Sequence, residues 1–186
     1  MKQNVLLHIC CGICAAHSVI RLRKEDFRVT GFFYNPNIHP RQEYIRRLEV
    51  AHQVSRELDF ELIEGKYEDT KWDMLTLGLH NEKEGAKRCG VCFRLRLSKT
   101  REKAEEMQIP FFTTTLTISP HKDSSVINRI GKAIGRQAYL EYDFKKKDGF
   151  KKTMEFSRTH NLYTQHYCGC VHSMADRHKE KVTECK

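Results

Sequence analysis

VLLHICCGICAAHSVIRLR, at residues 5–23, joins a short apolar run to a helical pattern through three closely spaced cysteines. The apolar run at 5–9 is typical of a strand that is buried on both faces of a parallel sheet. The spacing of apolar residues over 15–23 predicts a helix immediately after it. We therefore expect an α/β fold in which these cysteines lie at the carboxyl end of a central strand, where such folds bind their ligands.

Strand and helix patterns alternate along the rest of the chain. We expect further strands at 28–34, 60–63, 111–116 and 138–142. We expect further helices at 41–58, 68–79, 91–107, 124–136 and 149–160. With 186 residues, the chain is long enough for one well-buried domain and too short for two. The prediction is a single domain, residues 1–186, built on one doubly wound, mostly parallel sheet.

The chain carries 33 Lys and Arg residues against 24 Asp and Glu residues, a net charge of +9. A basic surface of this size favours a polyanionic partner such as nucleic acid, although charge alone is equally compatible with a generic basic protein. Residues 4–20 carry no Asp, Glu, Lys or Arg, but they include three cysteines and are shorter than the roughly 20 apolar residues of a membrane span. We expect no membrane association and a cytoplasmic location, where reducing conditions favour metal-binding or redox-active cysteines over structural disulfides.

Seven of the eight cysteines fall into three groups, which we expect to form the active site: Cys10, Cys11 and Cys14; Cys89 and Cys92; and Cys168 and Cys170. The eighth, Cys185, lies in a charged tail, and we expect no catalytic role for it.

Cys89 and Cys92 form a C-x-x-C pair at the expected start of a helix. Such a pair alone is compatible with half a zinc site, part of an iron-sulfur site or a thioredoxin-like dithiol. The helix dipole and the neighbouring Arg88 are expected to bias both sulfurs towards thiolate, which is the form that binds metals.

Cys10 and Cys11 are adjacent, whereas the paired ligands of structural zinc are typically separated by two to four residues. Neighbouring cysteines that leave a strand end suit a polynuclear cluster better. Together with Cys89 and Cys92, they supply the four thiolates of a four-iron cluster. Cys14, about one helical turn further on, is an alternative ligand or the ligand of a second metal.

Cys168 and Cys170 are separated by a single glycine. Two sulfurs this close can form a small, strained ring, and strained disulfides are the labile and catalytic ones. We interpret the pair as a redox-active dithiol. The alternative is two further metal ligands or two small buried residues.

Three histidines and one carboxylate also lie near expected strand ends. We interpret His8 as a core residue, whereas His39 and His121 lie in loops where they could contact a substrate. Asp123 could donate a proton, or it could cap the helix expected at 124–136. The chain has neither a G-x-x-x-x-G-K-[ST] phosphate loop nor a G-x-G-x-x-G signature. We therefore expect a scaffold resembling nucleotide-binding (HUP-like) domains, with cysteines in place of the phosphate loop and no nucleotide cofactor.

The order and spacing of these motifs resemble those of the QueH-type epoxyqueuosine reductases. The family's motifs appear here as Cys10-Cys11-Gly12-Ile13-Cys14, Arg88-Cys89-Gly90-Val91-Cys92, Thr114-Thr115-Leu116-Thr117-Ile118-Ser119-Pro120 and Tyr167-Cys168-Gly169-Cys170. Gly12-Ile13 departs from the Ala-Pro that is common in the family, without affecting a ligand. The similarity covers most of the chain, and the three cysteine motifs together are far more specific than any one of them.

The resemblance implies the last step of queuosine synthesis, in which epoxyqueuosine at the wobble position of tRNA is reduced to queuosine and the epoxide oxygen leaves as water. It implies an iron-sulfur oxidoreductase without cobalamin, supplied with electrons by a donor that the sequence does not identify. It also implies residue roles: a [4Fe-4S] cluster on Cys10, Cys11, Cys89 and Cys92, and a redox-active disulfide between Cys168 and Cys170.

Removal of an epoxide oxygen needs two electrons, activation of the carbon-oxygen bond and a proton source. We hypothesise that an additional iron ion near Cys10 or Cys14 binds the oxygen, while the cluster delivers electrons and the third cysteine pair relays them. Asp123 and His121 are the candidate proton donors. Basic side chains would bind the phosphates of the tRNA, and we predict this surface at Arg94, Arg96, Lys145, Lys146, Lys147, Lys151 and Lys152.

Three other interpretations stay open. A zinc-stabilised RNA-binding module without catalysis would use Cys89 and Cys92 with two of the N-terminal cysteines. An ATP-dependent tRNA-thiolating enzyme could share the scaffold, but the missing phosphate loop counts against it. A thiol-disulfide oxidoreductase acting on proteins would need only one of the three cysteine groups.

Overall fold

The computed structural model describes residues 2–174, and these contain one sheet of four parallel strands in the order β3-β2-β1-β4. The strands are β1 (Gln3–His8), β2 (Phe27–Phe33), β3 (Leu62–Glu64) and β4 (Phe111–Thr114). Cys185 lies outside the described residues.

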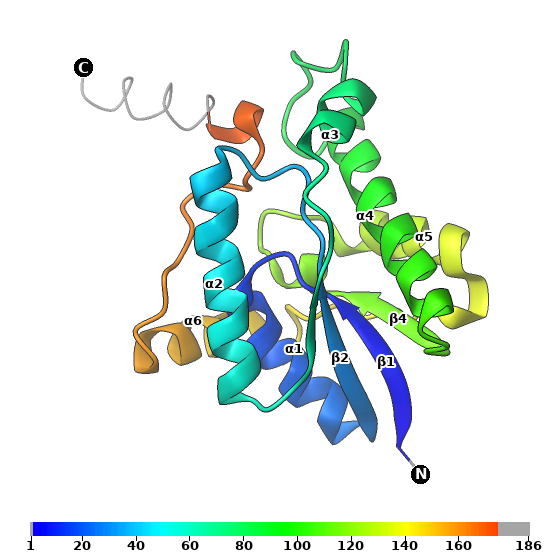
Figure 1. Cartoon of the computed structure of the whole chain (residues 1–186), viewed down its shortest axis with the longest axis vertical. Helices are drawn as coiled ribbons and strands as arrows, with labels where there is room; N and C mark the ends of the chain where they lie inside the picture. The colour runs from blue at the N-terminus through cyan, green and yellow to red at the C-terminus, as the bar shows by residue number, and fades with distance from the viewer. Residues whose placement is uncertain (1, 175–186) are drawn as a thin grey trace.

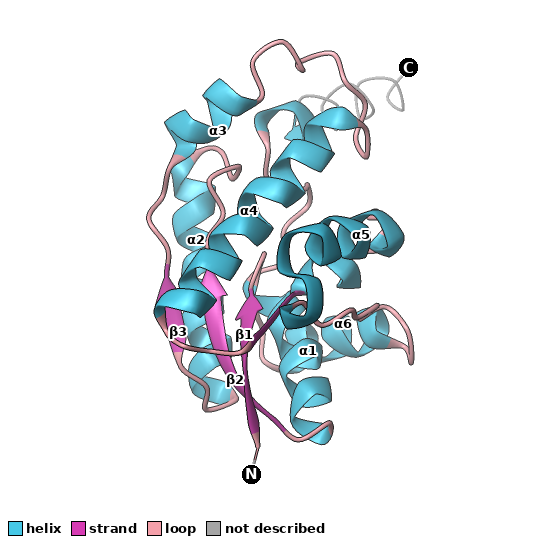
Figure 2. Cartoon of the chain, turned by 90° about the vertical axis from the view of Figure 1, so that its right-hand side faces the viewer, coloured by secondary structure: helices cyan, strands magenta, loops and turns pink. Residues whose placement is uncertain are grey.

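Helices cover both faces of this sheet (Figures 1 and 2). On one face α1 packs against both α2 and α6, and on the other α4 packs against α5. The helices are α1 (Gly12–Lys24), α2 (Arg41–Glu57), α3 (Asp69–Leu75), α4 (Lys87–Glu106), α5 (Ser124–Gly135) and α6 (Gly149–Thr159). The expected doubly wound parallel sheet is confirmed.

Strand β1 is buried on both faces, as its apolar run predicts. Val5 and Leu7 pack into the core beneath α1 and α2, while Leu6 packs into the core beneath α4 and α5. β1 pairs in parallel with β2 on one side and β4 on the other. The chain that leaves its carboxyl end therefore emerges at the centre of the sheet, which is where Cys10 and Cys11 lie.

The strand expected at 138–142 is absent from the described residues. Tyr139 forms only an isolated bridge with Phe112, because the chain reaches this point directly from a 3₁₀ turn, Arg136–Ala138. The Thr113 hydroxyl donates a hydrogen bond to the carbonyl of Leu140 (2.8 Å), so a side-chain hydrogen bond takes the place of a backbone hydrogen bond between strands. The strand expected at 111–116 is also shorter than predicted, since Thr115–Ile118 forms a 3₁₀ turn that Thr114 caps.

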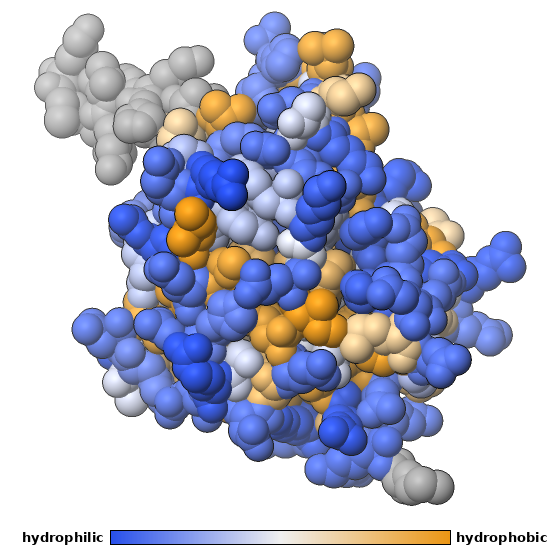
Figure 3. All heavy atoms as spheres, viewed as in Figure 1, coloured by the Kyte–Doolittle hydropathy of each residue, from blue (hydrophilic) through white to orange (hydrophobic). Residues whose placement is uncertain are grey.

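The described helices include none that is long and apolar enough to cross a membrane. Hydrophilic side chains cover most of the face shown in Figure 3, and apolar side chains gather towards its middle. This distribution agrees with the heavily charged composition of the chain.

Candidate metal centre and thiol site

A cavity of about 610 Å³ opens beside the carboxyl end of β1. Its walls come from the first turn of α1, the 116–122 segment, α6 and the 164–168 segment. Three cysteines from two separate motifs line it: Cys10, Cys14 and Cys168. Ligands of doubly wound sheets bind at this end of the strands, so the cavity is the candidate active site.

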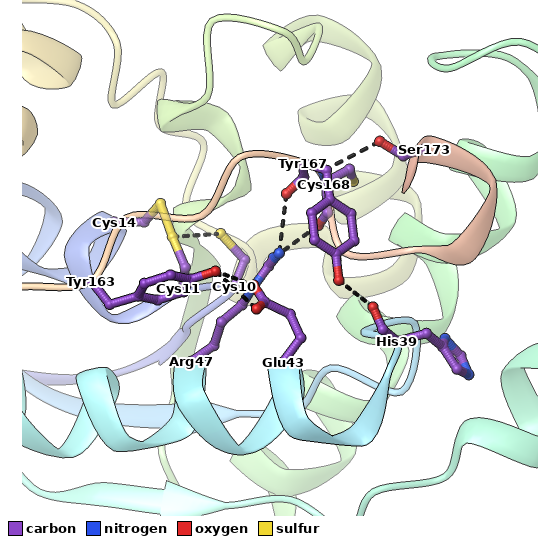
Figure 4. A network of polar contacts seen from close by, with 10 residues as sticks. All are labelled: Cys10, Cys11, Cys14, His39, Glu43, Arg47, Tyr163, Tyr167, Cys168 and Ser173. Atoms are coloured by element: carbon purple, nitrogen blue, oxygen red, sulfur yellow. Dashed lines mark hydrogen bonds and ion pairs between the residues drawn. A yellow bond between two sulfur atoms is a disulfide. The ribbon is translucent and has the colours of Figure 1, made fainter. Parts of the chain in front are cut away.

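The N-terminal cysteines form a compact sulfur group. The sulfurs of Cys10, Cys11 and Cys14 all lie within 4.8 Å of one another, a spacing at which they could hold a metal ion. Cys11 and Cys14 are joined by a disulfide, and the Cys10 sulfur lies 3.9 Å from that of Cys11 (Figure 4). The Thr115 hydroxyl donates to the Cys10 sulfur (3.2 Å) and accepts from the Cys10 backbone N–H (3.0 Å), which fixes Cys10 against β4 and its following turn.

Close packing of α1 against α2 sets the position of this group. Gly12 opens α1, and a Cβ atom added there would lie 2.5 Å from the backbone carbon of Val50 in α2. Since real Cβ atoms are essentially never so close to another atom, only glycine fits this helix crossing. Gly12 thus allows the close packing of α1 on α2.

The second sulfur group lies around the start of α4. Cys92 is buried in a small apolar cluster with Trp72 and Cys170. Negative charge on Cys168 acts on both Cys89 and Cys92, so these sulfurs are close enough to influence one another's ionisation. Cys10 and Cys89 border the same apolar cluster beneath α4.

Burial, rather than the helix dipole, dominates the ionisation of the C-x-x-C pair. It raises the pKa of the Cys89 thiol, and it raises the pKa of Cys92 to about 11. The Arg88 guanidinium donates instead to the carbonyls of Leu79, His80 and Glu82, where it closes the preceding loop. The positive charge of Arg88 does lower the pKa of Cys89, as expected, but burial outweighs it and the pKa values of both thiols are raised overall.

Cys168 and Cys170 have opposite ionisation behaviour. A hydrogen bond from the Cys170 thiol lowers the pKa of Cys168 well below its usual value, and the positive charges of Lys122, Arg96 and Arg47 lower it further. The same hydrogen bond and burial raise the pKa of Cys170. Cys168 is thus the thiolate of the pair and Cys170 the proton donor to it.

The tight sulfur group contains Cys14, the alternative ligand expected from the sequence. Among the described residues, Cys14 rather than Cys89 or Cys92 completes the tight group with Cys10 and Cys11. The C-x-x-C pair lies on α4, which packs on the opposite face of the sheet from α1. Both sulfurs of the expected Cys168–Cys170 disulfide are free thiols, and the disulfide joins Cys11 and Cys14 instead.

A buried polar layer lies beneath the cavity. Arg96 is only 2% exposed and donates from Nε to the His8 ring (3.3 Å) and from Nη2 to Asn35 Oδ1 (2.5 Å). Its Nη1 lies 3.8 Å from the Cys92 sulfur. Arg96 therefore places a positive charge under the site and is not part of a tRNA-facing surface, contrary to expectation. The expectation that His8 is a satisfied core residue is confirmed, since it is fully buried and its Nδ1 lies 2.8 Å from Thr114 Oγ1.

The two candidate proton donors lie in different environments. The Asp123 carboxylate accepts from the Ser125 backbone N–H (2.8 Å) and from its hydroxyl (2.7 Å), so it caps α5. Those hydrogen bonds also lower the pKa of the Asp123 carboxyl. His121 is exposed and lines the cavity. His39 lies in the loop after β2, with Nδ1 3.1 Å from the Asn37 carbonyl.

Lys122, the cation of the 119–123 loop, is a functional candidate to which the sequence alone assigned no role. It lines the cavity next to His121. Burial lowers the pKa of its ammonium group, but negative charge on Cys168 and Cys10 outweighs burial, and the pKa is raised overall. Its position just beyond the carboxyl end of β4 was the signal that could have pointed to it.

Comparisons with known proteins identify relatives of the chain. The family model described as "Epoxyqueuosine reductase QueH" matches residues 5–176. The chain is 36% identical over 182 residues to "Epoxyqueuosine reductase QueH" of Streptococcus pyogenes serotype M1, covering 93% of this chain and 71% of that protein. It is 33% identical over 187 residues to the protein of the same name from Thermotoga maritima, covering 97% and 95%.

A solved structure shares the fold alone. The crystal structure of a predicted subunit of tRNA methyltransferase from Methanocaldococcus jannaschii superposes with a TM-score of 0.50 and 10% sequence identity, covering 84% of this chain and 74% of that one. Sequence identity this low shows a shared architecture and no shared activity.

Proposed function

The chain belongs to the epoxyqueuosine reductase QueH family, and on that premise we propose that it reduces epoxyqueuosine at the wobble position of tRNA to queuosine in the cytoplasm. The observation that carries the proposal is the cavity at the end of β1, which is lined by cysteines of the first and third motifs. The overall change is defined: both bonds of the epoxide oxygen break, a carbon-carbon double bond forms, and two electrons and two protons convert the oxygen to water.

A [4Fe-4S] cluster is proposed on Cys10, Cys11, Cys89 and Cys92. The donors fit this group chemically, since thiolates are the usual ligands of such clusters and a four-iron cluster holds its ligand sulfurs farther apart than a single ion does. The indole N–H of Trp72 is buried beside Cys92 without a hydrogen-bond partner among the described residues, which leaves a donor for a sulfur ligand. When bound, the cluster would supply electrons, and an additional iron ion near Cys14 would supply a Lewis acid.

The chain's own side chains account for proton and electron supply. Oxidation of the Cys168 thiolate and the Cys170 thiol to a disulfide releases two electrons and one proton, so the reduction needs one further proton. The Lys122 ammonium group, in the wall of the same cavity, is proposed to hold a proton near the departing oxygen. An electron donor must then reduce the disulfide again.

Phosphate contacts are proposed on the exposed basic side chains of the predicted surface, which excludes Arg96 and the half-buried Lys145. The retained residues are Arg94, Lys146, Lys147, Lys151 and Lys152, all exposed. They would hold the anticodon arm while the modified base enters the cavity.

The deciding experiment is the visible absorption spectrum after anaerobic reconstitution with iron and sulfide, before and after dithionite, followed by an assay on tRNA that carries epoxyqueuosine. A brown, bleachable protein that forms queuosine supports the proposal. A colourless, zinc-loaded protein without activity would favour the zinc-stabilised RNA-binding module, which would use Cys89 and Cys92 with two of the N-terminal cysteines.

A further inference from the structure

Arg47 of α2 reaches the segment that carries the third cysteine motif, although 120 residues separate them in sequence. Its side chain is 3% exposed. It donates from Nη1 to the carbonyl of Cys168 and from Nη2 to the carbonyl of Tyr167, each at 3.1 Å (Figure 4). Arg47 also lines the cavity together with Cys168.

Glu43 fixes the orientation of this guanidinium. One helical turn before Arg47, its carboxylate accepts from Nε at 2.7 Å, and both side chains are buried. The Tyr163 hydroxyl donates to the same carboxylate at 2.8 Å. A planar guanidinium held at Nε presents its other nitrogens in one fixed plane, which is how arginine recognises a pair of oxygens.

The loop before α2 also holds the cysteine segment. The backbone N–H of His39 donates to the Gly169 carbonyl (2.7 Å), and the Tyr167 hydroxyl donates to the His39 carbonyl. Gly169 has a φ of +117°, and a Cβ atom there would lie 3.0 Å from both Arg47 Nη1 and Ile38 Cγ1. Glycine between the two cysteines is thus required by conformation and by the closeness of Arg47.

We propose that Arg47, oriented by Glu43, is a positioning residue that fixes the Cys168–Gly169–Cys170 segment with the Cys168 sulfur at the cavity. Its bonds go to main-chain carbonyls and not to sulfur, so the contact persists whether the two cysteines are thiols or a disulfide. The role in catalysis rests on the proposed function, whereas the positioning itself does not.

The test compares Arg47→Met with Arg47→Lys and with a matched control, Arg56→Met. Arg56 lies in the last turn of the same helix, α2, and is exposed. Two readouts on reduced, metal-free protein need no tRNA: hydrogen-deuterium exchange of the peptide containing residues 165–171, and the pH midpoint of Cys168 alkylation.

In Arg47→Met we expect at least tenfold faster exchange in that peptide and an alkylation midpoint about one pH unit higher, because one of three facing cations is lost while Lys122 and Arg96 remain. Arg47→Lys should keep an alkylation midpoint close to that of wild type but lose most of the protection from exchange, and Arg56→Met should match wild type in both. Unchanged exchange and midpoint in a folded Arg47→Met protein would overturn the proposal. If Arg47→Met does not fold, the same two assays are made on Glu43→Gln. Wild-type exchange and a wild-type alkylation midpoint in Glu43→Gln would also overturn the proposal.

A reductase assay distinguishes the positioning role of Arg47 from the proposed function of the protein. With epoxyqueuosine-containing tRNA, loss of positioning should lower kcat and leave KM within twofold, because the tRNA surface is untouched. A wild-type protein without reductase activity would refute the proposed function while leaving the exchange and alkylation results to decide the role of Arg47.

Discussion

At the scale of single residues, identity alone does not set the reactivity of these cysteines. Cys168 and Cys92 carry the same thiol, but the pKa of Cys168 lies well below its usual value and that of Cys92 is raised to about 11. Cys168 has a hydrogen-bond donor and three cations beside it, whereas desolvation dominates at Cys92. Only the folded chain brings those cations to Cys168.

Cys168 is therefore expected to react with iodoacetamide at pH 7, while Cys92 and Cys170 react measurably only at alkaline pH. The sign follows from the thiolate being the nucleophile: a lowered pKa keeps Cys168 ionised at neutral pH, and raised pKa values keep the other two protonated. Peptide mass spectrometry of metal-free, reduced protein gives the three rates separately. Faster labelling of Cys170 than of Cys168 at pH 7 would reverse the assigned roles.

Lys122 and Asp123 are adjacent but should respond differently to substitution. Lys122→Met removes the proton held at the cavity and is expected to lower turnover about 100-fold or more. Asp123→Asn keeps a good helix cap and should leave turnover unchanged, and Asp123→Ala should lower the melting temperature but not turnover. Single-turnover rates with matched iron content provide the measurement. Comparable losses in Lys122→Met and Asp123→Asn would argue against a proton-supplying role specific to Lys122.

At the scale of elements, the junction between β1 and α1 brings three cysteines together. Cys10 lies just after the end of β1. Cys11 is the N-cap residue of α1 and has an extended conformation, and Cys14 lies in the first turn of α1. The periodicity of the sequence placed this junction correctly, but it did not show that Cys11 and Cys14 would share a disulfide. A bonded Cys11 sulfur cannot at the same time serve as a thiolate ligand.

Metal uptake is accordingly expected to require prior reduction of the Cys11–Cys14 disulfide. A dithiol reductant supplies two electrons and two protons, and the freed thiols then lose protons as they bind iron. Protein treated with dithiothreitol before anaerobic reconstitution should retain at least several-fold more iron than untreated protein, measured by a colorimetric iron assay after desalting. Equal iron content in both samples would exclude Cys11 as an essential ligand.

At the scale of the whole molecule, basic side chains gather around α6 and the turn before it, close to one wall of the cavity. The Lys146, Lys147 and Lys151 side chains are exposed there, whereas other lysines of the chain pair with carboxylates along their own helices. A charged surface beside a cavity is the arrangement that a tRNA substrate requires.

Replacing Lys146, Lys147 and Lys151 with Ala should weaken tRNA binding and lower the slope of log K against log salt by about 2 to 3, if each contacts one phosphate. The matched control replaces three lysines that form ion pairs elsewhere, Lys99, Lys103 and Lys132. Fluorescence anisotropy with a labelled anticodon stem-loop, from 50 to 200 mM salt, measures both effects. A slope that falls equally in both triple variants would show only a general effect of net charge.

The sequence by itself determined the α/β class, the buried first strand, the order of most strands and helices, and the three cysteine motifs, because these depend on local patterns of apolar residues and on residue identity. The sequence predicted a longer β4 than the structure has, and a strand at 138–142 that the structure lacks among the described residues. Side-chain hydrogen bonds and 3₁₀ turns can replace a strand while the pattern of apolar residues stays the same.

Only the tertiary structure decided which sulfurs meet and how each ionises. Cys14 joins Cys10 and Cys11, Arg96 turns inward, and Arg47 binds carbonyls about 120 residues away. Distances between side chains on different elements follow from strand order and helix packing, and a pKa follows from burial and from charges that the fold brings near. Neither is encoded in the spacing of a motif along the chain.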